Sequence, residues 1–101
     1  MAEKFRAALT RREVAVRDFF DLDHAITALG LNPEATDLID MVRQKVTIPA
    51  CDPILVGQER LMTLSAQVDT RLGPVLRPQD FQRFDLHRAF DAVARMAIAI
   101  K

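Results

Sequence analysis

The sequence contains the run AFDAVARMAIAI at residues 89–100, in which Asp91 and Arg95 are the only charged side chains. Apolar side chains recur from residue 86 onward at steps of three and four: Leu86, Phe90, Val93, Ala97 and Ile100. This is the period of one face of an α-helix. A helix that is apolar over so much of its circumference is typical of a central helix or of one shared between subunits. The run therefore predicts an all-α protein organised around this segment.

Prolines divide the rest of the chain into further helical segments. Three dipeptides place Pro where a helix is expected to begin: Asn32-Pro33, Asp52-Pro53 and Arg77-Pro78. Pro suits the first helical position because the N–H that it lacks has no partner there, and Asn and Asp are good N-terminal caps. Gly30 and Gly73 lie just upstream of two of these starts, where a helix C-terminal glycine is expected. The pattern predicts four amphipathic segments, at residues 3–29, 33–46, 53–72 and 78–100.

Two of these segments leave an alternative open. In segment 3–29, Asp21 or Asp23 is suited to cap a new helix, so a break near residues 20–23 is the alternative to one long helix. In segment 53–72, Gly57 either permits close approach of another helix or marks a later helix start. We expect a single domain over residues 1–101, a small antiparallel bundle of four helices, or of five if the first segment breaks.

Composition limits the class of protein. The chain has 101 residues, no net charge and a half share of hydrophobic residues, so we expect a folded domain rather than a disordered chain. Its single cysteine, Cys51, and the lack of a secretory leader pattern predict a cytoplasmic protein. The sequence has no apolar run of the length that a membrane span needs. A neutral chain is not typical of nucleic-acid binding, so we expect no nucleic-acid partner and no membrane contact.

The charges are unevenly placed along the chain. Residues 1–17 carry five basic side chains against Glu3 and Glu13. Residues 18–40 carry six acidic side chains and no Lys or Arg: Asp18, Asp21, Asp23, Glu34, Asp37 and Asp40. The acidic block is a candidate surface for a basic partner, whereas the simpler interpretation is a solvated face with acids matched to helix N-termini.

A metal site has little support in the sequence. Asp21 and His24 are three residues apart and therefore share a face of a continuous helix, which makes them weak metal-ligand candidates. Asp37 or Asp40 is the candidate for a further ligand, but the set stays incomplete, since the second histidine, His87, has no acid at helical spacing except Asp91. We therefore expect no metal and no cofactor.

Arg12 is the residue that most favours a small-ligand site. It lies within the apolar stripe of segment 3–29, where its guanidinium must either reach the surface along its methylene stem or face an anion. Together with Arg43 and Arg60 it would form a pocket for a small anionic ligand, because guanidinium groups bind carboxylates and phosphates in two-pronged fashion. This is the alternative hypothesis, and it includes an enzyme.

The main hypothesis is a non-enzymatic interaction module that self-associates and docks a protein partner. It rests on analogy with other small helical bundles, which bind partners when no polar groups converge on one site. The expected homodimer would use the apolar face of segment 78–100, through Phe90, Val93, Ala97 and Ile100. The alternative to a dimer is a compact monomer that buries this segment in its centre.

Overall fold

The computed structural model describes residues 2–11, 13–47 and 56–100, and in these ranges the regular structure is helical throughout. The elements in chain order are α1 (Ala2–Thr10), α2 (Val16–Ala28), α3 (Thr36–Val46), α4 (Gln58–Gln67), the π-helix η1 (Val68–Leu72), α5 (Pro78–Arg83) and α6 (Leu86–Ala99). The expected all-α fold is confirmed. Within the described ranges, none of the helices combines the length and the apolar character needed to cross a membrane.

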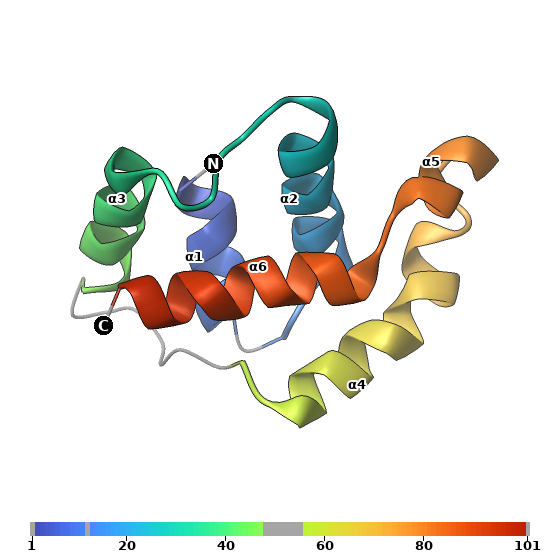
Figure 1. Cartoon of the computed structure of the whole chain (residues 1–101). Coiled ribbons are helices and arrows are strands. Elements are labelled where there is room, and N and C mark those ends of the chain that lie inside the picture. Colours follow the sequence, from blue (N-terminus) through green and yellow to red (C-terminus); the bar gives the residue numbers. More distant parts are fainter. Residues whose placement is uncertain (1, 12, 48–55, 101) are drawn as a thin grey trace.

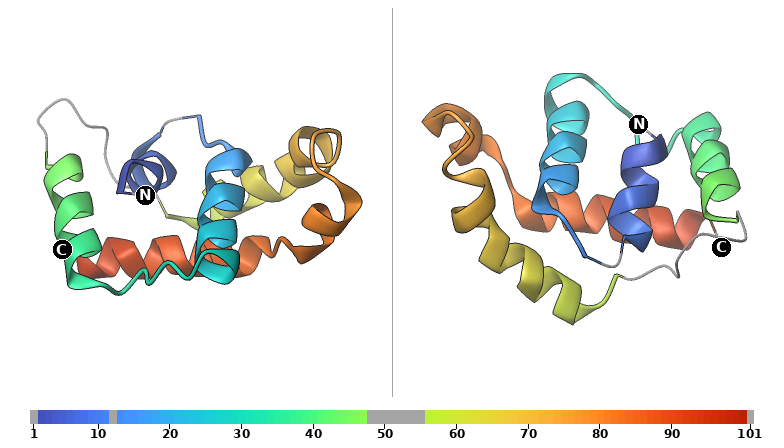
Figure 2. Two further views of the ribbon diagram at one scale, coloured as in Figure 1. Left: turned by 90° about the horizontal axis from the view of Figure 1, so that it is seen from above. Right: turned by 180° about the vertical axis from the view of Figure 1, so that it is seen from behind.

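The helices are arranged around α6. Helices α3, α1 and α2 stand side by side, and α6 crosses this row (Figure 1). Helix α4 lies beneath this row, near the end of α1 and the start of α2, and it also contacts α6 (Figure 2). Helix α1 packs against α2, α3 and α6, so it lies at the centre of the row. The bundle therefore contains a crossing helix as well as neighbouring ones.

The apolar face of α6 forms one side of the hydrophobic core. Val93, Ala97 and Ile100 are buried within the chain itself, and Phe90 is partly buried with its ring stacked 6.1 Å from that of Phe19. The facing side chains come from the other helices: Phe5, Leu9, Phe19, Leu22, Val42 and Leu64. The side chains that we expected to mediate self-association thus have partners inside one chain, as the compact alternative requires. Homodimerisation itself stays a prediction.

Two of the helix-boundary signals act as predicted. Pro78 is the first residue of α5, after Arg77 in an extended conformation. Gly30 follows α2 with a φ of 73°, a left-handed conformation that glycine adopts without steric cost, and the next N–H, of Leu31, donates to the carbonyl of Ala25.

Other boundaries differ from the prediction. Asn32 does not cap a helix at Pro33, because its side-chain oxygen accepts from the N–H of Glu34 in a turn, and α3 begins only at Thr36. Helix α4 begins at Gln58 after Gly57, which is the later start left open by the sequence. The predicted start at Asp52-Pro53 lies outside the described residues.

The first and last segments each break into two helices. The break in segment 3–29 falls between Thr10 and Val16, not near residues 20–23, where α2 continues without interruption. In segment 78–100, α5 ends at Arg83, and Asp85 begins α6 by accepting a hydrogen bond from the N–H of Arg88. A longer first helix was predicted because the apolar period resumes after the break in step with the residues before it, and a longer last helix because Pro78 was taken as its start.

Replacing Gly30 with Ala should reduce the free energy of unfolding by about 1–2 kcal/mol, because a β-carbon is unfavourable in the left-handed conformation. Urea titration followed by circular dichroism measures this loss. The neighbouring variant Leu29→Ala is the control, because Leu29 is 70% exposed and its truncation should change stability by less than about 0.5 kcal/mol. An equal loss in both variants would contradict the assigned role of Gly30.

Candidate functional site

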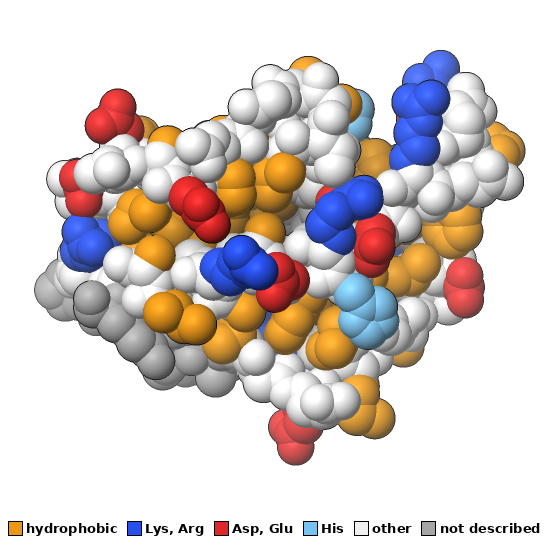
Figure 3. Space-filling model, viewed as in Figure 1, with side chains coloured by type: hydrophobic (Ala, Val, Ile, Leu, Met, Phe, Trp, Pro, Cys, Tyr) orange, Lys and Arg blue, Asp and Glu red, His pale blue; other side chains and the backbone are white. Residues whose placement is uncertain are grey.

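A largely apolar groove lies beside α6. Its volume is about 550 Å³, and Ile26, Ile39 and Ile98 contribute to its lining. Figure 3 shows apolar side chains gathered over α6 with charged groups among them. Arg95 lies among the charged lining groups, and its guanidinium is 2.9 Å from the carboxylate of Asp91 and 3.8 Å from that of Glu34. Arg95 therefore pairs with Asp91 and Glu34, and the described lining residues do not form a cluster of polar groups that could act on a substrate.

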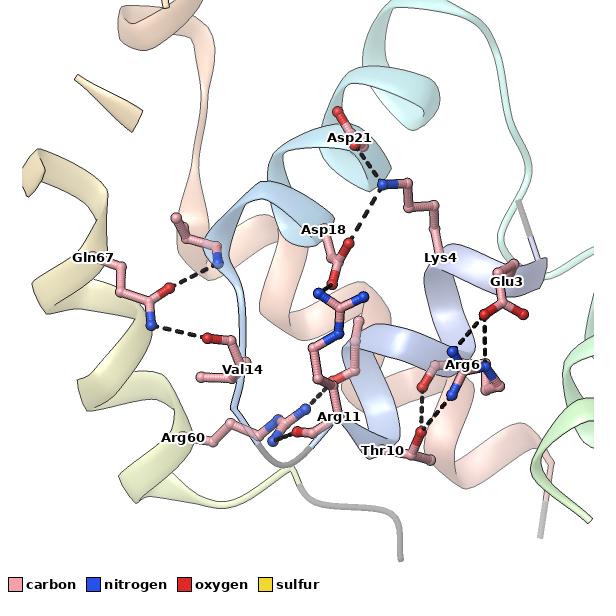
Figure 4. A network of polar contacts seen from close by, with 12 residues as sticks. Glu3, Lys4, Arg6, Thr10, Arg11, Val14, Asp18, Asp21, Arg60 and Gln67 are labelled. Atoms are coloured by element: carbon pink, nitrogen blue, oxygen red, sulfur yellow. Dashed lines mark hydrogen bonds and ion pairs between the residues drawn. The ribbon is translucent and has the colours of Figure 1, made fainter. Parts of the chain in front are cut away.

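A cluster of charged side chains lies where α1, α2 and the link between them meet (Figure 4). The Lys4 amine is 2.8 Å from Asp21 Oδ2 and 3.4 Å from Asp18 Oδ1. Arg11 approaches the other oxygen of Asp18, with Nη1 3.5 Å from Oδ2. Arg17 Nε lies 3.4 Å from Asp21 Oδ1. We call Lys4, Arg11, Arg17, Asp18 and Asp21 the Lys4–Asp18 cluster.

The local sequence explains how the cluster forms. Asp18 and Asp21 are three residues apart on α2, so both carboxylates project from one face of the helix. Asp18 lies in the first turn of α2, where the helix dipole favours a negative charge. Lys4 comes from α1 and Arg11 from just beyond its end, and the packing of α1 against α2 brings them opposite these acids.

Asp18 is a buried carboxylate whose charge is only loosely matched. Its side chain is 6% exposed, and Oδ2 has no hydrogen-bond partner among the described residues. Its two ion-pair contacts with described residues, at 3.4 and 3.5 Å, are long for charge-assisted hydrogen bonds. The hydrogen bond to Asp21 raises the pKa of the Lys4 amine, and the negative charges of Asp21 and Asp18 act in the same direction. Lys4 therefore stays protonated at neutral pH.

Asp23, the other buried carboxylate of α2, is satisfied much more completely. Arg88 of α6 donates to both of its oxygens, from Nε at 2.7 Å and from Nη2 at 2.8 Å. The backbone N–H of Asp85 donates a third hydrogen bond, at 3.4 Å. This is a fork-to-fork pair that joins α2 to α6 and has a structural role. The contrast identifies Asp18, and not Asp23, as the functional candidate.

Two of the cations proposed from the sequence for an anion pocket, Arg43 and Arg60, make separate contacts. Arg43 donates to the carbonyls of Ala99 and Ile100 at the end of α6. Arg60 is buried and donates to the carbonyls of Ala8 and Arg11 at the end of α1. Burial lowers the pKa of the Arg60 guanidinium, and the charge of Asp18 opposes this effect. Arg12 lies outside the described residues.

The weak metal-ligand candidates also belong to separate contacts. Asp21 faces Lys4 and Arg17, whereas His24 stacks on the ring of Phe20 with centroids 6.1 Å apart. Throughout residues 2–11, 13–47 and 56–100, no group of three His, Cys, Asp or Glu side chains is placed to hold a metal ion.

Sequence reasoning treated the acidic block as one surface and missed the cluster. Asp18 and Asp23 are buried, whereas Glu34, Asp37 and Asp40 are exposed, so the block is not a single solvated face. The available signal was the basic stretch of residues 1–17 directly before the acids. A turn between the two stretches places opposite charges face to face, but the continuous apolar period concealed that turn.

The substitution Asp23→Asn should lower the free energy of unfolding by about 2 kcal/mol or more, because it breaks a buried bidentate pair. Asp18→Asn should cost at least about 1 kcal/mol less, since the long contacts of Asp18 offset less of the cost of burying its charge. Urea denaturation of the two variants measures the difference. Equal losses in the free energy of unfolding would show that the two carboxylates contribute equally to stability, which would contradict this distinction between them.

Comparison with protein families identifies the chain's relatives. The model of one family, described as "Nucleotidyl transferase AbiEii toxin, Type IV TA system", matches residues 1–96. The match spans nearly the whole chain, and the chain belongs to this family. No curated protein and no solved structure gives a significant match.

The family corrects the main functional hypothesis. A non-enzymatic interaction module is wrong, because the description of the family names an enzymatic toxin. The expectation of a protein partner agrees with it more closely, since the description assigns the family to a toxin–antitoxin system. The expected homodimer and the expected lack of a nucleic-acid partner stay predictions.

Proposed function

We propose that this member of the AbiEii family acts in nucleotidyl transfer, and that its Lys4–Asp18 cluster binds the phosphates of a nucleoside triphosphate. The observation that carries the proposal is the partly open set of cations around a buried, loosely matched carboxylate. Three cations face two carboxylates in the cluster, which leaves an excess of one positive charge for an anionic ligand.

The chemistry of the transfer defines what the cluster must do. An acceptor oxygen forms a bond to the α-phosphorus, and the bond from that phosphorus to the oxygen bridging to the β-phosphate breaks. Pyrophosphate leaves with the bonding electrons, and the proton of the acceptor passes to a base. Negative charge grows on the leaving phosphates, so fixed cations beside them stabilise the transition state.

Lys4 and Arg11 are the side chains suited to contact the phosphates. Their side chains are 40% and 48% exposed, so both reach a ligand without rearrangement of the core. Their contacts with Asp18 are long, and phosphate oxygens compete well for such donors. Asp18 lies beneath them and acts as a positioning group that keeps the two cations on the same side of α2.

Nucleotidyl transfer commonly employs divalent metal ions held by carboxylates. The described residues do not supply such a set, and Asp18 and Asp21 both face cations. We therefore assign the phosphate-contacting role to the cations and no metal ligands to the described part of the chain.

The partner that fits this proposal is an antitoxin protein, the second component of the system named in the family description. Such a partner agrees with the earlier expectation of protein binding. The groove beside α6 shares no lining residue with the Lys4–Asp18 cluster, so a partner in the groove need not contact the cations of the cluster.

The proposal is tested by calorimetric titration of the chain with inorganic pyrophosphate and with ATP, GTP, CTP and UTP in turn. Pyrophosphate and at least one nucleotide should bind. Lys4→Ala and Arg11→Ala should each weaken binding about tenfold or more, as expected for loss of a charge-assisted hydrogen bond.

Arg77→Ala is the control variant, because Arg77 is an exposed cation directly before α5 that pairs with Asp80 alone among the described residues. It removes the same charge and should bind pyrophosphate as the wild type does. Absence of binding by the wild-type chain to all five ligands, or an equal loss in Arg77→Ala, would overturn the proposal.

A further inference from the structure

We propose that α4 is a positioning helix for the Lys4–Asp18 cluster, and that Arg60 and Gln67 set the distance between the two halves of the cluster. The inference rests on the proposed function. This inference goes beyond the proposed function because it assigns a role to two side chains that do not touch the phosphates. Both lie about fifty residues along the chain from the backbone that they hold.

Arg60 fixes the α1 side of the cluster. Its Nη2 donates to the carbonyl of Ala8 at 2.8 Å and its Nη1 to the carbonyl of Arg11 at 2.7 Å (Figure 4). The last carbonyls of a helix lack partners within the helix, and the negative end of the helix dipole favours a cation there. Because the second carbonyl belongs to Arg11, Arg60 determines where the Arg11 side chain leaves the backbone.

Gln67 fixes the α2 side. Its Oε1 accepts from the N–H of Val16 at 2.9 Å, and its Nε2 donates to the carbonyl of Val14 at 2.9 Å. Val16 is the first residue of α2, and Ala15 before it has no side chain able to cap the helix. Gln67 thus supplies from α4 the cap that the local sequence lacks, two residues before Asp18.

The two contacts explain why the chain breaks between α1 and α2. Residues 11–15 contain no Pro or Gly, and the apolar period resumes at Val16 in step with Phe5 and Leu9. Arg60 and Gln67 instead bind the backbone on both sides of the break, and this pairing favours the turn over a continuous helix. Without the turn, Lys4 and Arg11 would not face Asp18 and Asp21.

The inference is tested with Arg60→Lys and Gln67→Met, by titration of each variant with inorganic pyrophosphate. Lysine keeps the positive charge but cannot hold two carbonyls with a rigid fork. Each variant should bind pyrophosphate about tenfold more weakly, as expected when charged groups are displaced by a fraction of an ångström to an ångström. The helical circular dichroism signal at the measuring temperature should equal that of the wild type.

A double-mutant cycle separates positioning from a general loss of stability. If Arg60 acts through Arg11, Arg60→Lys should have little further effect on pyrophosphate binding in the Arg11→Ala background. Thr63→Ala is the matched control on α4, since the Thr63 hydroxyl donates only to Glu59 of its own helix among the described residues. This control should bind pyrophosphate as the wild type does.

The outcomes distinguish this inference from the proposed function. If Lys4→Ala loses pyrophosphate binding while Arg60→Lys and Gln67→Met keep it, α4 does not position the cluster and the proposed function stands. Additive effects in the cycle would equally overturn a role of Arg60 through Arg11. A wild-type chain that does not bind pyrophosphate would overturn both proposals.

Discussion

The hydrogen bonds from α4 to the link between α1 and α2 are the interactions on which the rest of the structure depends. Arg60 is only 8% exposed, and burial of an unpaired guanidinium would cost several kcal/mol. Two short hydrogen bonds to carbonyl groups, the helix dipole of α1 and the nearby charge of Asp18 offset this cost. Because these compensations exist only when α1, α2 and α4 meet, the buried cation selects this arrangement over a longer first helix.

The parts of the fold that were predictable carry their signal within a few residues. The period of apolar side chains at residues 89–100 indicated the central helix, Pro78 marked the start of α5, and Gly30 marked the end of α2. Each of these signals acts through backbone geometry or through the faces of a single helix. Such local signals can be recognised in the sequence without knowing which other segments pack against the helix.

The parts that were not predictable depend on partners far along the chain. A sequence scan reads Asp18 and Asp23 as equivalent members of one acidic block. The partners of Asp23 lie on α6, more than sixty residues away, whereas Asp18 faces cations that lie close in sequence but across an unforeseen turn. The turn itself depends on Gln67 and Arg60. The spacing of residues along the sequence therefore predicts neither the site nor the chemistry of the family.

The contrast between the two buried carboxylates also bears on why the Lys4–Asp18 cluster is loosely paired. The Asp23–Arg88 contacts, at 2.7 and 2.8 Å, satisfy both partners and leave little for a ligand to gain. Around Asp18 the contacts are longer and one oxygen lacks a hydrogen-bond partner in the described structure, so stability is lost there relative to a closed pair. Incomplete pairing of this kind is typical of sites where charges must exchange partners during function. A tightly closed cluster would hold α1 against α2 more firmly, but its cations would then have to break strong contacts before meeting a phosphate.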